Sequence, residues 1–194
     1  MIEKSHCYGD EHWIQTFTGR KFWPLDPKPE DVFIEDIAHS LSLTCRFGGH
    51  VKEFYSVAQH SVLVSECCMS QKKWGLLHDA AEAYLADICK PIKPYMNGFA
   101  DFEEDVLIAV SERFGLTYPI PTSVHLRDLQ MLATEQAHLM DAGLDWVGLG
   151  SVCPIENLNI EPWHSSSAEM SFLSAFERLF GRAEDVENCL SDVL

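Results

Sequence analysis

The chain has 194 residues, 46% of them hydrophobic, and a formal net charge of −16. This length suits one domain, for which about 100–200 residues is usual. The charge argues against duplex nucleic acid as a main partner, because affinity for phosphates comes from clustered lysine and arginine. No run of about 18 apolar residues predicts a membrane span, and the first residues lack the apolar stretch of a secretory signal. Seven scattered cysteines without a C-x-x-C pair favour reduced thiols, so we expect a cytoplasmic protein.

The first segment of the chain is predicted to be a short hairpin or extended. Aromatic side chains lie on either side of Thr18-Gly19, and Pro24, Pro27 and Pro29 then keep the chain extended. Apolar residues at helical spacing predict helices that begin near 31, 54, 74, 99 and 122. Glycines and prolines are expected to end these helices before 48, near 69, before 91 and near 115, and the fifth continues to 139.

The carboxyl-terminal part of the chain is predicted to be irregular and then helical. The segment 143–162 contains glycine and proline, and a last helix begins near 165, where Ser166 and Glu169 have capping-box spacing. Thr122 or Ser123 is expected to cap the helix before it. The pattern as a whole predicts an all-α globule of five to seven helices, in one domain with a core over about 17–141 and a helical extension over 142–194.

Four residues on three of these helices could form a metal site: His60, His78, Asp79 and Asp128. Two imidazoles and two carboxylates suit a first-row divalent ion that must keep open positions for water and a substrate oxygen. A histidine on an apolar helix is more often a buried core residue, and acidic residues more often form a solvated face. From the residues alone, both interpretations remain open.

Further charged residues lie close to the His78-Asp79 pair in the sequence. On a continuous helix Glu82 would share a face with both residues, beside a water bound to the ion, and Asp87 follows as a second carboxylate. Lys90 and Lys93 then place two cations at a turn that prolines stiffen. Cations next to an acidic cluster would make a reasonable receptor for phosphate.

The strings RFGGH, FYSVAQHSVLVS, LLHDAAEAYLADICKPIK and RDLQMLATE resemble the HD-domain metal-dependent phosphohydrolases. The resemblance covers about 17–139 and is greatest to small phage and prophage members related to bacterial 5′-deoxynucleotidases. It implies that the four metal-site residues are the ligands and that Glu82 and Asp87 position or activate the attacking water.

The same resemblance implies a nucleotide pocket. It places Arg46 and Phe47 in that pocket and Lys93 on the phosphate, whereas Lys90 replaces a small hydroxyl residue of the bacterial nucleotidases. The amino-terminal string TFTGRKFWPLDPKPEDVFIEDIAHSLS is also similar to phage dATP triphosphohydrolases of phages whose genomes carry 2-aminoadenine.

These observations predict an enzyme that removes phosphate from deoxynucleotides, with dATP, dADP and dAMP the leading substrates. We expect a divalent transition metal (Co, Mn or Zn), a homo-oligomer, and a place in the host cytoplasm if a phage encodes the chain. Three alternatives remain: a 5′-deoxynucleotidase acting on monophosphates only, a non-catalytic module that binds nucleotide or metal, and a helical interaction protein.

Overall fold

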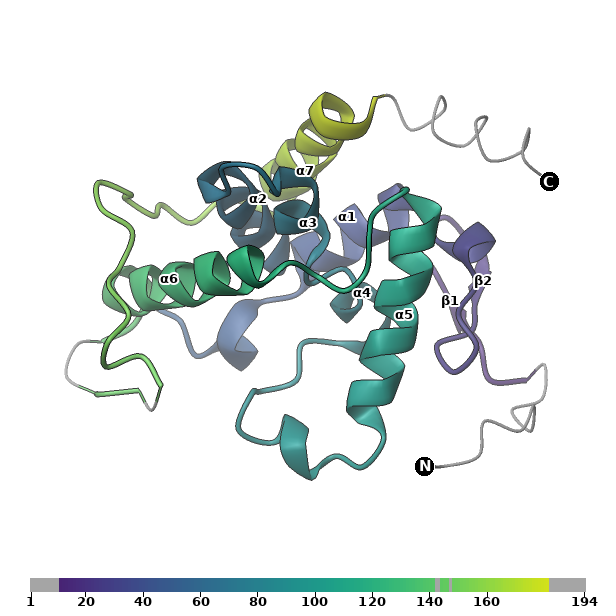
Figure 1. Ribbon diagram of the computed structural model, residues 1–194, viewed down its shortest axis with the longest axis horizontal. Coiled ribbons are helices and arrows are strands. Elements are labelled where there is room, and N and C mark those ends of the chain that lie inside the picture. The colour runs from purple at the N-terminus through teal and green to yellow at the C-terminus, as the bar shows by residue number, and fades with distance from the viewer. Residues whose placement is uncertain (1–10, 142–143, 147, 182–194) are drawn as a thin grey trace.

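The computed structural model describes residues 11–141, 144–146 and 148–181, and confirms an all-α fold with a small amino-terminal hairpin (Figure 1). The elements, in chain order, are β1 (Ile14–Gln15), β2 (Lys21–Phe22), η1 (Pro29–Asp31), α1 (Ile34–Leu43), η2 (Arg46–Gly49), α2 (Val57–Cys67), α3 (Lys72–Leu77), α4 (Glu82–Leu85), η3 (Lys93–Tyr95), α5 (Phe99–Arg113), α6 (Thr122–Leu139) and α7 (Ser165–Phe180). None of the helices in these described ranges combines the length and apolar character that crossing a membrane requires.

The hairpin is short, and both an aromatic side chain of β2 and hydrogen bonds from its turn fix it to the helices: Thr18 N and Oγ1 donate to the Asp36 carboxylate at 2.7 and 3.0 Å. Its two antiparallel strands pair Ile14 with Phe22 and Gln15 with Lys21. Phe22 is fully buried, and its ring stacks on that of Tyr84 with centroids 3.8 Å apart. The hairpin therefore belongs to the main core, although its outer strand is exposed.

Helix α2 lies at the centre of the molecule and carries one of the candidate ligands. Every residue from Val57 to Ser65 is buried, and α2 packs against α1, α3, α6 and α7 (Figure 1). Its amino terminus is capped by Ser56, whose side chain accepts a hydrogen bond from the Gln59 amide at 3.1 Å. A side chain that points inward from α2 is therefore held on all sides.

Helix α7 belongs to the main core even though it lies in the segment expected to be an extension. Ala168, Phe172, Ala175 and Phe176 are buried in the same apolar cluster as residues of α1, α2 and α3. The parts of that expected extension at 142–143, 147 and 182–194 lie outside the described residues, as do Cys7 and Cys189.

Two predicted helix caps are wrong. Thr122 and Ser123 lie inside α6, whose N-cap is Pro121 without a side-chain hydrogen bond. The N-cap of α7 is His164, and its imidazole accepts from the Ser166 amide at 3.3 Å. Glu169 does not complete a capping box because its carboxylate pairs with His39 at 3.2 Å instead.

The helix expected to begin near 74 and to end before 91 is interrupted at the candidate site. Helix α3 ends at Leu77, a turn follows, and α4 begins at Glu82. In the turn the backbone hydrogen bonds span three residues, from Ala80 to Leu77 and from Glu82 to Asp79, both at 3.0 Å. This tighter winding rotates His78 and Asp79 away from the positions that a continuous α-helix would give them.

Candidate metal centre

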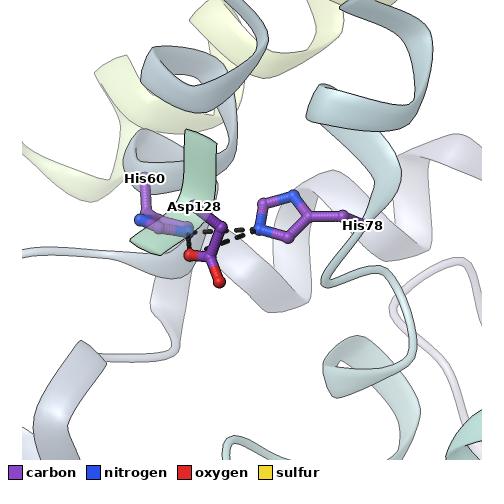
Figure 2. Close-up of side chains that lie close together, drawn as sticks. All are labelled: His60, His78 and Asp128. Atoms are coloured by element: carbon purple, nitrogen blue, oxygen red, sulfur yellow. Dashed lines mark hydrogen bonds and ion pairs between the residues drawn. The ribbon is translucent and has the colours of Figure 1, made fainter. Parts of the chain in front are cut away.

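Three side chains from separate parts of the chain converge on one point (Figure 2). His60 comes from α2, His78 from the turn after α3, and Asp128 from α6. The His60 Nε2 atom lies 3.2 Å from His78 Nε2 and 3.2 Å from Asp128 Oδ1, and His78 Nε2 lies 3.9 Å from the same oxygen. These ligand atoms all lie within 4.8 Å of one another, so the group could hold a metal ion.

The orientation of the two imidazoles fits a cation. His78 Nδ1 lies 2.8 Å from the Gly75 carbonyl oxygen, which can only accept, so Nδ1 donates. His60 Nδ1 lies 2.6 Å from Glu135 Oε1. A neutral imidazole that donates through Nδ1 presents a lone pair at Nε2. Two such lone pairs facing each other repel unless a cation lies between them, and that cation can be a proton on His60 Nε2 or a metal ion that binds both nitrogens.

Asp79 lies at the edge of the same cluster. Its Oδ2 atom is 3.5 Å from His60 Nε2, 3.4 Å from His78 Nε2 and 3.5 Å from an Arg46 guanidinium nitrogen. All four residues expected to bind the ion are therefore brought together. The role of Asp79 as a fourth metal ligand remains a prediction.

Glu135 is a buried residue of the site that the sequence analysis did not predict. It is fully buried on α6, and its carboxylate accepts from Tyr55 at 2.8 Å and from Arg46 at 3.1 Å, besides contacting His60. Glu135 follows Asp128 by seven residues, about two turns along the same helix face. That spacing is the one signal in the sequence that could have found it.

The charged groups of the site shift one another's pKa values. Burial is the largest influence on His60 and lowers its pKa, as does Arg46, but Glu135 and Asp128 outweigh both and raise the pKa to about 9. Burial also acts most strongly on Asp128 and raises its pKa, yet the hydrogen bond and charge of His60 bring it well below the usual value. Before any ion binds, the site thus favours a positive charge between its carboxylates.

Glu82 is buried beside this cluster with one oxygen unsatisfied. Its Oε2 atom has no hydrogen-bond partner among the described residues, and its Oε1 atom lies 3.7 Å from Lys93 Nζ. Burial, followed by the charges of Asp79 and Asp87, raises the pKa of Glu82 to about 9. The half-buried Asp87 has its own pKa raised, chiefly by burial.

The two lysines expected to bind phosphate differ in their surroundings. Lys93 is half-buried and donates to Glu103 Oε1 at 2.8 Å. Lys90 is exposed and forms no hydrogen bond or ion pair with any residue in the described part of the chain. The structure therefore brings Lys93 to Glu82 and leaves Lys90 at the surface.

Arg46 and Phe47 lie in a tight turn at η2. The Arg46 side chain forms ion pairs with two carboxylates beside the candidate metal cluster, at 3.1 Å with Glu135 and 3.5 Å with Asp79. Phe47 has a φ of 57°, and its ring packs edge-on against Trp146 with centroids 5.6 Å apart. A positive φ is rare for an aromatic residue, so the surrounding contacts must hold this turn. Contact of either residue with a nucleotide remains a prediction.

Comparison with known proteins places the chain in a family. It is 38% identical over 169 residues to the uncharacterized protein YfdR of Escherichia coli strain K12, an alignment that covers 86% of this chain and 95% of YfdR. It is also 37% identical over 123 residues to the uncharacterized protein RCAP_rcc00048 of Rhodobacter capsulatus, covering 58% of this chain and 63% of that protein. No protein-family model matches the chain. The chain belongs to the same family as YfdR.

Proposed function

We propose that this protein is a metal-dependent phosphohydrolase of the HD type that removes phosphate from deoxynucleotides, with dATP, dADP and dAMP the leading substrates. One observation carries the metal-dependent part of the proposal. The Nε2 atoms of His60 and His78 face each other at 3.2 Å beside Asp128, while both Nδ1 atoms face acceptors. The resemblance of the HD strings to phosphohydrolases supports the reaction and the substrate class.

The donor set suits a first-row transition ion such as Co, Mn or Zn. His60, His78 and Asp128 would hold it, with Asp79 as the fourth ligand. When bound, such an ion lowers the pKa of a water ligand toward about 7 and so supplies a nucleophile at neutral pH.

Glu82 is the residue best suited to handle the proton of that water. Its Oε2 atom is buried and lacks a partner among the described residues, so a water molecule would satisfy it. In the metal-free protein, burial and the charges of Asp79 and Asp87 raise the pKa of Glu82 to about 9, so the group keeps its proton at neutral pH. A cation bound nearby would favour the carboxylate, which could then orient a water or accept its proton. Asp87 adds a second carboxylate whose charge acts on Glu82.

Lys93 supports the choice of a phosphorylated substrate. A protein with a net charge of −16 repels anions in general, so a phosphate needs a local cation. Lys93 Nζ lies between Glu103, at 2.8 Å, and Glu82, at 3.7 Å. It can therefore bind a phosphoryl oxygen next to the group that we assign to the water.

The proposal is tested by the products formed from a panel of deoxy- and ribonucleotides. Purified protein would be treated with chelator, reloaded with Co²⁺ or Mn²⁺, and given mono-, di- and triphosphates of each base. We expect deoxyadenosine and phosphate from dATP, dADP and dAMP, with slower turnover of the ribo forms. Glu82→Ala should lose about 10²-fold in rate or more while still binding metal.

Any different result from this panel of nucleotides would indicate a different function. Comparable turnover of dATP, dGTP, dCTP and dTTP would exclude adenine specificity. Activity on dAMP without activity on dATP would indicate a 5′-deoxynucleotidase. Bound metal and nucleotide without turnover would indicate a binding module, and a protein that binds neither would leave the helical interaction protein.

A further inference from the structure

We infer that Glu135 is a positioning residue that holds the candidate ligand His60 and the loop residue Arg46 with one buried carboxylate; this inference rests on the proposed function. The carboxylate uses both of its oxygens. Oε1 lies 2.6 Å from His60 Nδ1 and accepts from the Tyr55 hydroxyl at 2.8 Å, and Oε2 accepts from Arg46 at 3.1 Å.

The contact to His60 fixes how that imidazole faces the cluster. A carboxylate that accepts from Nδ1 keeps the hydrogen on that atom, leaves Nε2 free to bind an ion, and prevents rotation of the ring. Asp128 comes from the same helix face two turns earlier and lies 3.2 Å from His60 Nε2. Helix α6 therefore supplies one candidate ligand directly and orients a second through Glu135.

The contact to Arg46 fixes the start of the turn that carries Phe47. The Arg46 amide donates to the Tyr55 carbonyl at 2.9 Å, and the Tyr55 hydroxyl donates to Glu135. The backbone and side chains of these residues thus form a closed set of hydrogen bonds. Phe47 follows directly at a positive φ. Loss of these hydrogen bonds would therefore leave both the turn expected to form the nucleotide pocket and the candidate metal ligand His60 without support.

Glutamine at position 135 would have the same shape but could not satisfy the same partners. An amide has one oxygen that accepts and one nitrogen that donates. If its oxygen faces His60 and Tyr55, its nitrogen meets the Arg46 guanidinium, which also only donates. If the amide is turned over, its nitrogen faces His60 Nδ1 and favours the tautomer in which Nε2 cannot bind an ion.

Titration with Co²⁺ in the absence of nucleotide tests this inference. Chelator-treated wild-type protein, Glu135→Gln and Glu169→Gln would be followed by the visible absorption of bound Co²⁺. Glu169 is the matched control because it also pairs with a histidine, His39, at 3.2 Å outside the cluster. We expect Glu135→Gln to weaken Co²⁺ binding by about 10–100-fold and to shift the absorption band. Glu169→Gln should bind like the wild type.

The outcomes separate this inference from the proposed function. Wild-type affinity and spectrum in a folded Glu135→Gln protein would overturn the inference and leave the metal centre intact. Failure of the wild type itself to bind Co²⁺ would overturn the metal centre and the inference together. If Glu135→Gln does not fold, ¹⁵N NMR of the Zn²⁺-loaded wild type decides. We expect a hydrogen on Nδ1 of His60 that its hydrogen bond to Glu135 protects from exchange with water. A rapidly exchanging Nδ1 hydrogen beside a metal-bound Nε2 would overturn the inference and leave the metal centre intact.

Discussion

At the scale of single residues, Glu82 couples the candidate site to the stability of the protein. Its pKa is raised from the ordinary 4.5 to about 9, first by burial and then by Asp79 and Asp87. The native state therefore keeps a proton that the unfolded chain releases above about pH 4.5. It follows that this group lowers the free energy of unfolding progressively as the pH rises from about 4.5 to about 9.

We predict that Glu82→Gln stabilises the metal-free protein at pH 8, because the amide is never charged. The gain should be on the order of 2 kcal/mol, or about 4–8 °C in Tm for a chain of this size. Thermal unfolding in chelator, followed by circular dichroism, measures it. The difference in Tm between Glu82→Gln and the wild type should become smaller as the pH is lowered toward 4.5. A wild type that gains stability relative to the variant between pH 5 and 8 would contradict the assigned pKa.

The sequence could predict the residue types of the site, but their partners only in part. The order and spacing of the HD strings point to His60, His78, Asp79 and Asp128, and the structure brings these four together. Glu135 lies 75 positions from the histidine that it contacts. Its spacing of seven residues from Asp128 indicates the same helix face but not which distant side chain it contacts, and a glutamate on a helix is normally assigned to the solvated face.

At the scale of elements, the packing of α3 on α2 depends on Gly75. A Cβ atom added there would lie 2.8 Å from Ser65 Cα and 3.1 Å from Ser65 N, so backbone would have to move. The Gly75 carbonyl also accepts from His78 Nδ1. Close approach of the two helices and orientation of a candidate ligand therefore depend on the same residue.

We predict that Gly75→Ala destabilises the protein by about 1–3 kcal/mol, the usual cost of overpacking, despite the better helix propensity of alanine. Thermal unfolding should show Tm reduced by about 2–4 °C for each kcal/mol. Gly150→Ala is the matched control, because an added Cβ would meet nothing within 4 Å. Equal Tm values for Gly75→Ala and the wild type would mean that α3 does not pack as closely on α2 as the structure has it.

Periodicity predicted the elements but not the interruption between α3 and α4. Leu77, Ala80, Ala81 and Tyr84 have helical spacing, and all are buried as that pattern requires. The winding nevertheless tightens over His78–Ala81, where the side chain of His78 is bonded to the backbone of Gly75. Apolar spacing reports which side of a segment is buried, and a tight turn can bury the same side.

At the scale of the whole molecule, the sequence predicted helix α7 but not the helices against which it packs. Its helical pattern over 165–180 was predicted, and the helix is present as Ser165–Phe180. Its packing on α1, α2 and α3 brings together residues that are at least 88 positions apart in the sequence, the separation of Leu77 from Ser165. A helical pattern reports an apolar face but not the partner that covers it. The carboxyl-terminal helix is therefore part of the body that supports α2 and His60.

The central claim is that the cluster of His60, His78 and Asp128 binds an ion on which phosphate release depends. The most direct test is phosphate release from dATP by chelator-treated protein before and after addition of Co²⁺. His60→Ala is compared with His125→Ala, an exposed histidine one turn before Asp128 on α6. We predict that Co²⁺ restores activity to the wild type and to His125→Ala but not to His60→Ala. Full activity in chelator, or restoration of His60→Ala to the wild-type rate, would contradict the claim.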